Sequence, residues 1–120
     1  MAINNVFVSG NLTRDPEKRQ TQSGMPVITF GIAVNERKRV NEKEFEDYAN
    51  FFDCVMFGER ANKLFDILSK GSKVSIAGKL RYSSWEKDGQ KRSKVEIVVN
   101  DIELHGTGKK GVQEELPFYE

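Results

Sequence analysis

The sequence predicts an all-β fold, a small five-stranded barrel with one helix between its third and fourth strands. Three observations support this prediction: five segments have the composition of strands, glycines interrupt three of them, and one segment has helical spacing. With 120 residues, the chain is long enough for one domain with its own core but too short for two.

The predicted strands are rich in valine, isoleucine and phenylalanine, as strands with a buried face usually are. They cover residues 4–12, 26–35, 49–57, 73–82 and 94–104. The second strand has the clearest period of two, and the side chains on its apolar face are Ile28, Phe30, Ile32 and Val34. Glycines inside strands commonly mark the bulges or bends that a small barrel needs to close, and here they are Gly10, Gly31 and Gly78.

The helix is predicted over residues 59–71, with a stop signal at Lys70-Gly71. Its core-facing side chains follow the i, i+3, i+4, i+7 pattern and are Ala61, Leu64, Phe65 and Leu68. Residues 14–26 and 36–48 are predicted linkers, and Asp88-Gly89 predicts a tight hairpin turn between the last two strands. This order of elements is that of the oligonucleotide/oligosaccharide-binding (OB) barrel.

Charge is distributed unevenly along the chain. All 19 basic side chains lie within residues 1–110, whereas the last ten residues carry three acids and no base. A basic body and an acidic, partly apolar tip suggest a polyanionic ligand for the body and a separate role for the tip. No apolar run approaches the ~20 residues that a membrane span requires. We expect no membrane association and a cytoplasmic location.

The sequence offers no set of catalytic residues, and we do not expect an enzyme. The single histidine, His105, would have to serve every Ser–His–Asp scheme, and no glycine-rich phosphate loop is present. The only cysteine, Cys54, lies in an apolar run that predicts a buried structural thiol. We therefore expect a binding protein that needs no metal, nucleotide or other cofactor.

The segment GKLRYSSWEKDGQKR, residues 78–92, combines aromatic and basic side chains. Trp85, the only tryptophan, and Tyr82 lie among the cations Lys79, Arg81 and Lys87. Exposed aromatic rings beside cations form stacking platforms for unpaired bases, with the cations holding the phosphates.

The third predicted strand has two candidate core faces. Phe52, Cys54 and Met56 form one compact apolar face, which would turn Phe51 and Phe57 outward towards Trp85. In the alternative, Phe51 and Phe57 belong to the core and Trp85 only caps a hairpin. The pattern alone leaves both interpretations open.

Five segments make the chain resemble the bacterial single-stranded DNA-binding (SSB) protein family. They are NNVFVSGNLTRDPE (4–17), VITFGIAVN (27–35), NFFDCVMFGERAN (50–62), LSKGSKVSIAGKLRYSSWEKDGQKR (68–92) and ELPF (115–118). The resemblance implies base stacking by Trp85, Phe51 and Phe57, and a basic contact by Lys70. It also implies homotetramers, and a nucleoid-associated role in DNA replication, recombination and repair.

The chain departs from the family pattern at several positions. Lys38 stands where the family often has another stacking tryptophan, and a cation can instead hold a phosphate or lie on a base. Asp53 and Glu59 occupy positions that are often basic in the family.

Two other functions remain open on the sequence. One is an OB protein that binds RNA or partner proteins. The other is an enzyme, a small nuclease, although no metal ligands for it are visible.

The predicted organisation is a single-stranded DNA-binding domain over residues 1–105, a short flexible linker over 106–113 and a partner-binding tip over 114–120. The tip residues expected to bind replication, recombination and repair proteins are Glu114, Glu115, Leu116, Pro117 and Phe118. The family ends at its Pro-Phe pair, whereas Tyr119 and Glu120 follow it here.

Overall fold

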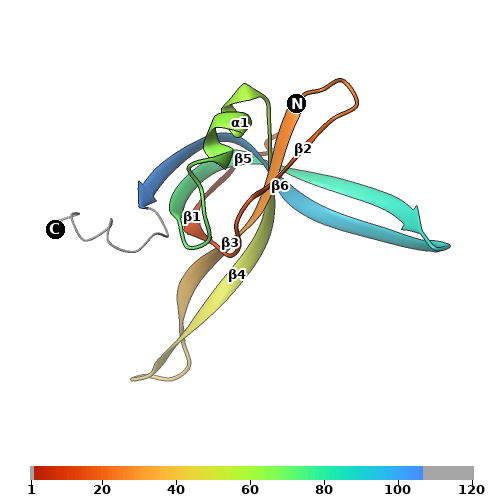
Figure 1. Cartoon of the computed structure of the whole chain (residues 1–120). Helices are drawn as coiled ribbons and strands as arrows, with labels where there is room; N and C mark the ends of the chain where they lie inside the picture. The colour runs from red at the N-terminus through yellow and green to blue at the C-terminus, as the bar shows by residue number, and fades with distance from the viewer. Residues whose placement is uncertain (1, 107–120) are drawn as a thin grey trace.

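The computed structural model describes residues 2–106, so the predicted linker and tip lie outside the described residues, apart from Gly106. The chain forms a barrel from which two long hairpins project (Figure 1). Its elements are β1 (Val6–Leu12), β2 (Glu17–Gln20), β3 (Pro26–Arg39), β4 (Phe45–Phe57), α1 (Glu59–Phe65), β5 (Lys73–Lys87) and β6 (Gln90–Gly106). The predicted five-stranded barrel with one helix is confirmed, and β2 is an additional short edge strand.

The barrel closes because β1 pairs with strands on both of its sides. The sheet order is β1-β5-β6-β4-β3-β2, and a further β1–β3 pairing joins Asn11 to Ala33 and Leu12 to Ile32. Gly10 lies where β1 crosses β3, and a Cβ atom there would collide with the Ala33 carbonyl oxygen. The bend expected at this glycine is therefore required by a close backbone approach.

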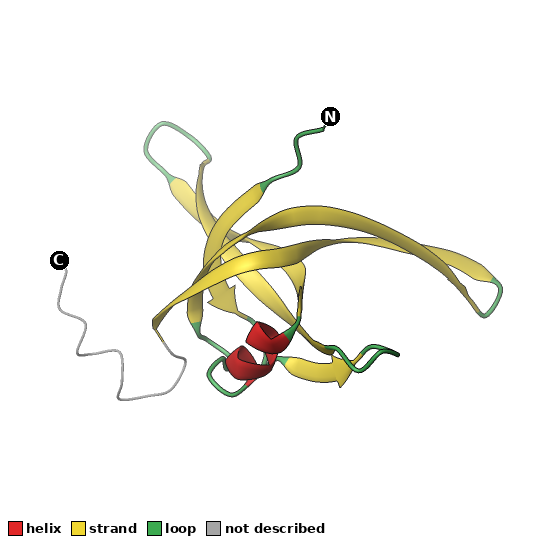
Figure 2. Cartoon of the chain, turned by 90° about the horizontal axis from the view of Figure 1, so that it is seen from above, coloured by secondary structure: helices red, strands yellow, loops and turns green. Residues whose placement is uncertain are grey.

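The core is built from one face of each barrel strand. The predicted β3 face is confirmed: Ile28, Phe30 and Ile32 are fully buried, and Val34 packs against the core. α1 covers one end of the barrel with Ala61, and Leu68 in the following loop is also buried (Figure 2).

The predicted helix was too long. It ends at Phe65, and the N–H groups of Ile67 and Leu68 both donate back to the Leu64 carbonyl. The Gly71 N–H donates to the Leu12 carbonyl at 2.8 Å, and the Leu12 N–H donates to the Ser72 carbonyl at 2.8 Å. These bonds connect the segment after α1 to the end of β1.

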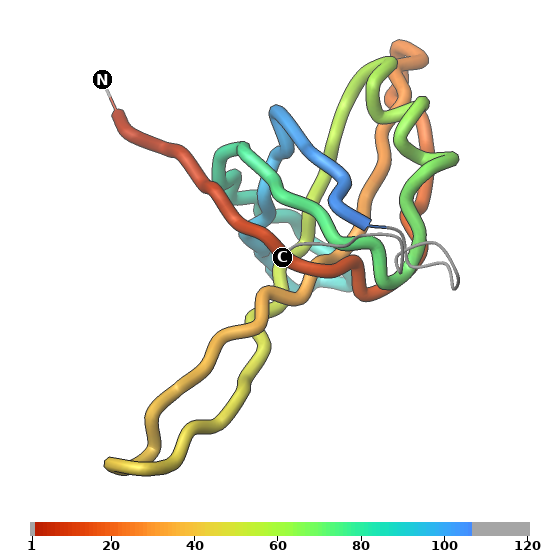
Figure 3. The backbone as a smooth tube through the Cα atoms, turned by 90° about the vertical axis from the view of Figure 1, so that its left-hand side faces the viewer, coloured from red at the N-terminus to blue at the C-terminus, as the bar shows by residue number. Residues whose placement is uncertain are grey.

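The two predicted linkers were wrong in part. Residues 36–48 are mostly strand, because β3 and β4 stay paired as far as Arg39 and Phe45 in a hairpin that leaves the barrel (Figure 3). Residues 14–26 contain β2, whose four side chains are all exposed. Neither segment has the buried face that makes a strand visible in a sequence.

The second projecting hairpin joins β5 to β6, and its tight turn confirms the predicted Asp88-Gly89 signal. Asp88 has φ 54° and Gly89 has φ 79°, the positive values that a two-residue turn of this kind requires. A register shift lies between Ala77 and Gly78, where the strand leaves the barrel. This is the irregularity expected at Gly78.

Candidate nucleic-acid interface

The outer face of β4 carries two exposed phenylalanines. Phe51 is 71% exposed and Phe57 is 36% exposed, whereas Cys54 and Met56 are buried. The predicted orientation of this strand is therefore confirmed for these four residues. Phe52 was expected in the core but is 38% exposed, and it lies beyond the part of β4 that pairs with β6, which is Cys54 and Val55.

The same face continues onto the β5–β6 hairpin. Paired residues on adjacent strands point to the same side of a sheet, and Val55 of β4 pairs with Val98 of β6. Val55 is buried at this junction, although the alternation pointed it outward with Phe51 and Phe57. Further along the hairpin, Trp85 of β5 pairs with Arg92 on this face and is 42% exposed. We call this continuous surface the outer face; of the predicted site residues it carries Phe51, Phe57, Lys79, Arg81, Trp85 and Lys87.

Arg81 joins the two parts of the outer face. Its Nη2 atom donates to Glu96 Oε1 at 2.7 Å, and its guanidinium lies over the Phe57 ring, 5.5 Å from the centroid. Lys94 Nζ lies 3.4 Å from Glu96 Oε2. Arg81 was predicted to hold a phosphate, but the structure gives this guanidinium protein partners that position it against Phe57.

Glu96 is the charged group most enclosed by this surface, with only 7% of it exposed. Burial alone would raise the pKa of its carboxyl, but the Arg81 hydrogen bond and the charges of Lys94 and Arg81 outweigh burial and lower the pKa. The carboxylate is therefore ionised at neutral pH and keeps Arg81 in place.

Three of the predicted site residues lie elsewhere. By register, Tyr82 faces away from Trp85 on the opposite side of its hairpin, and Lys38 lies opposite the outer face on the β3–β4 hairpin. Lys70 has an exposed side chain in the loop after α1, where its backbone N–H donates to Asp15 at 2.7 Å. Their contacts with DNA remain predictions.

The sequence interpretation missed a basic and aromatic cluster on the β3–β4 hairpin. Arg37 and Arg39 lie over the Phe45 ring, 5.6 Å and 5.9 Å from its centroid. The register places all three on the same face as Phe51. Alternation within ERKRV would have revealed the two arginines if this segment had been recognised as a strand.

A second missed group lines a cavity of about 230 Å³ on the outer face. Its lining residues come from the loop after β1 and from β2, β3, β4 and β6: Arg14, Glu17, Arg19, Thr29, Asp53, Cys54, Lys94 and Glu96. Arg14 Nη2 lies 4.0 Å from Asp53 Oδ1. The cavity therefore has mixed charge and lies beside the exposed aromatics.

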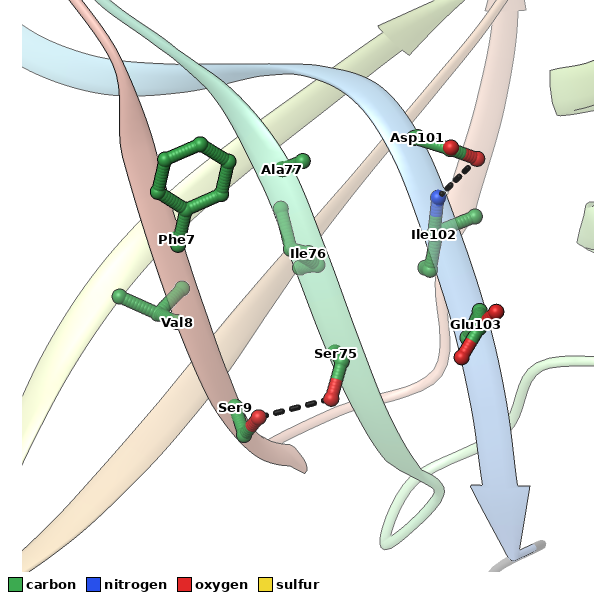
Figure 4. A pocket seen from close by; sticks show the side chains of 9 residues that line it. All are labelled: Phe7, Val8, Ser9, Ser75, Ile76, Ala77, Asp101, Ile102 and Glu103. Atoms are coloured by element: carbon green, nitrogen blue, oxygen red, sulfur yellow. Dashed lines mark hydrogen bonds between the residues drawn. The ribbon is translucent and has the colours of Figure 1, made fainter.

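A different pocket lies over β1, β5 and β6, where Phe7, Ala77 and Ile102 are among its lining residues (Figure 4). Ser9 and Ser75 are hydrogen-bonded there at 2.7 Å, and Ser75 also bonds His105 Nε2 at 2.7 Å. A serine and a histidine in contact are two members of a hydrolytic triad, but among the described residues no carboxylate is hydrogen-bonded to the His105 ring.

Residues 2–106 give little support for a nucleophilic cysteine or for a metal site. Burial raises the pKa of the Cys54 thiol to about 12, so this buried cysteine is a weak nucleophile. The described part of the chain contains no group of three or more His, Cys, Asp or Glu side chains placed to hold a metal ion. It also contains no helix long and apolar enough to cross a membrane.

The comparison with known families identifies the family of this chain. Residues 3–105 match the model of the single-strand binding protein family. The chain belongs to this family. A relative from Borreliella burgdorferi, named single-stranded DNA-binding protein, is 45% identical over 113 residues, which is 92% of this chain and 75% of that protein. A Treponema pallidum protein of the same name is 39% identical over 105 residues, 88% of this chain and 59% of its own length.

Solved structures of the family have the same fold. A deletion mutant of the single-stranded DNA binding protein from Thermus aquaticus superposes with a TM-score of 0.77 at 28% identity, covering 86% of this chain and 50% of that chain. The Plasmodium falciparum SSB complex with ssDNA superposes with a TM-score of 0.74 at 25% identity, covering 87% of this chain and 94% of that one. Their likeness confirms the predicted OB-fold barrel.

Proposed function

We propose that this member of the single-strand binding protein family binds single-stranded DNA with little dependence on sequence and protects it during replication, recombination and repair. The observation that carries the proposal is the continuous outer face, where Phe51, Phe57 and Trp85 are exposed beside cations. Every base has an aromatic face, so stacking tolerates any sequence. The structural likeness to a family member in complex with ssDNA supports the proposal.

Fluorescence titration of Trp85 with oligo-dT tests this function directly, because the only tryptophan lies in the proposed site. We expect quenching that saturates, and an affinity that falls linearly with salt on logarithmic axes, with a slope near −0.7 per phosphate neutralised. Weaker binding of a matched oligo-U would separate DNA binding from RNA recognition, which uses the 2′-hydroxyl. Affinity that does not change with salt would contradict phosphate contacts.

The salt dependence of DNA affinity also tests which face of the β3–β4 hairpin contacts the phosphates. Arg39→Ala, on the outer face, should flatten the slope by about 0.7, the value of one phosphate contact. Lys38→Ala removes the same charge from the opposite face and tests the sequence-based expectation that Lys38 also holds a phosphate. An unchanged slope in Arg39→Ala would remove the β3–β4 hairpin from the proposed DNA path.

We propose that this chain assembles as a homotetramer. Phe7 is 76% exposed on the face of β1 shown in Figure 4, and only the end of β1 pairs with β3. An unpaired strand edge and an exposed ring are both covered when copies of a chain pair symmetrically. Light scattering of the whole chain should give four times the monomer mass, and the monomer mass at micromolar concentration would refute the proposal.

The acidic tip, residues 114–120, is proposed to recruit genome-maintenance proteins. Glu114 and Glu115 would meet a basic rim, while Leu116, Pro117 and Phe118 would enter an apolar pocket. Because Tyr119 and Glu120 move the terminal carboxylate away from the Phe118 ring, VQEELPFYE should bind a pocket for SSB tails more weakly than VQEELPF. Equal or tighter binding of the longer peptide would show that both added residues belong to the recognition motif.

A further inference from the structure

The mixed-charge cavity on the outer face places a carboxylate in the path proposed for a polyanion. Three acids line it together with Arg14, Arg19 and Lys94. Glu96 is held by Arg81 and Lys94 at 2.7 Å and 3.4 Å, so its position is explained by protein contacts. Glu17 lies on β2, which is separated from β4 by β3.

Asp53 differs from Glu96 and Glu17, because it has no cation of the described residues within hydrogen-bonding distance and it lies on the same strand as Phe51. Its side chain is 54% exposed, and its cation, Arg14, is 4.0 Å away, which is beyond hydrogen-bonding distance. It lies on the same strand face as Phe51 and two residues further along β4. Because a strand rises about 3.3 Å per residue, the backbone position of Asp53 lies about 7 Å along the strand from that of Phe51.

A base stacked on the Phe51 ring would therefore extend its edge towards Asp53. An ionised carboxylate only accepts hydrogen bonds, so it discriminates between base edges. Cytosine presents an exocyclic amino donor, which is the group that aspartate accepts from in base recognition. Thymine presents a carbonyl oxygen at the same position, and two oxygens that face each other repel.

We propose that Asp53 is a specificity-determining residue that favours cytosine over thymine in the base position beside Phe51. Arg14 balances the carboxylate in the free protein and is close enough to turn to a neighbouring phosphate when DNA binds. The resulting bias is modest and is superimposed on stacking that accepts any base. This inference rests on the proposed binding of single-stranded DNA to the outer face.

The test compares oligo-dT and oligo-dC of about 15 nucleotides, a length within the range of OB-fold sites. The measured quantity is the ratio of the two dissociation constants, Kd for oligo-dT over Kd for oligo-dC, followed by Trp85 fluorescence at one salt concentration. Intrinsic differences in stacking between the two bases cancel when this ratio is compared between protein variants. Asp53→Asn should lower the ratio about fivefold, because an amide can donate to a thymine oxygen as well as accept from cytosine.

Glu46→Gln is the matched control. It removes the same charge from the same hairpin, but Glu46 pairs with Lys38 on the opposite face. This variant should tighten both oligonucleotides equally and leave the ratio unchanged. Asp53→Ala, which offers neither donor nor acceptor, should also lower the ratio, and unchanged melting curves would confirm that both Asp53 variants remain folded.

The outcomes separate this inference from the proposed function. A ratio that falls only in the Asp53 variants supports it. If Asp53→Asn tightens both oligonucleotides to the same extent as Glu46→Gln, then Asp53 acts by charge alone and the specificity proposal is overturned while DNA binding stands. If the wild-type protein binds neither oligonucleotide, both proposals fall.

Discussion

Replacing both Phe51 and Trp85 by alanine should weaken oligo-dT binding by roughly 2–6 kcal/mol, because each stacked base contributes roughly 1–3 kcal/mol. The rings lie on different strands, β4 and β5, so we expect their effects to add approximately. Phe51 is 71% exposed and Trp85 is 42% exposed, so both substitutions should change the melting temperature little. Fluorescence anisotropy with labelled oligo-dT measures the loss without depending on Trp85 itself.

Tyr82→Ala provides the matched control for this prediction. It removes an exposed aromatic ring from the same hairpin as Trp85, but from the opposite face. A site confined to the outer face predicts a clearly smaller loss for Tyr82 than for Trp85. Equal losses would show that DNA contacts both faces of the β5–β6 hairpin, and a double variant that binds like the wild type would eliminate aromatic stacking as the source of affinity.

The barrel was predictable because its strands have a buried face. Ile28, Phe30 and Ile32 recur at a period of two, and this spacing is a direct consequence of burying alternate side chains. The outward orientation of Phe51 and Phe57 was not fixed by the pattern, because both faces of β4 carry large apolar side chains, and the family resemblance decided between the two orientations. A strand with one buried face has a period-two hydrophobic pattern in its sequence.

The projecting hairpins were only partly predictable because hydrogen bonding between exposed strands produces no hydrophobic pattern in the sequence. The segment around Glu36, Lys38 and Glu46 is exposed on both faces, so its charges suggested a loop. Its pairing is nevertheless continuous along β3 and β4. The arginines over Phe45 were missed together with the strand that carries them.

The positions of Arg81 and Asp53 depend on tertiary contacts that a linear pattern does not encode. Arg81 was predicted only as a phosphate contact in a basic segment, and its ion pair was not foreseen because the partner, Glu96, lies on the opposite strand of the hairpin. Asp53 was recognised only as a departure from the family pattern. Its proximity to Arg14 brings together the loop after β1 and strand β4.

Gly78→Ala should destabilise the protein by roughly 1–3 kcal/mol, the usual range for overpacking a close contact. A Cβ atom at this position would collide with the Val98 carbonyl oxygen and lie 3.2 Å from Ile97 Cγ2. The carbonyl belongs to the backbone, so the strand itself must shift. Urea unfolding at equilibrium measures the loss.

Gly106→Ala is the control, because this glycine also lies in a strand but has no atom of the described residues within 4 Å of the position that a Cβ atom would take. Its effect should be small or slightly stabilising, since alanine restricts the unfolded chain more than glycine does. Gly78 also marks the register shift where β5 leaves the barrel towards Trp85. The forced shift should therefore reorient the β5–β6 hairpin and weaken oligo-dT binding, whereas Gly106→Ala should bind normally. If Gly78→Ala is as stable as Gly106→Ala, the close approach of β5 and β6 at this point does not constrain the fold.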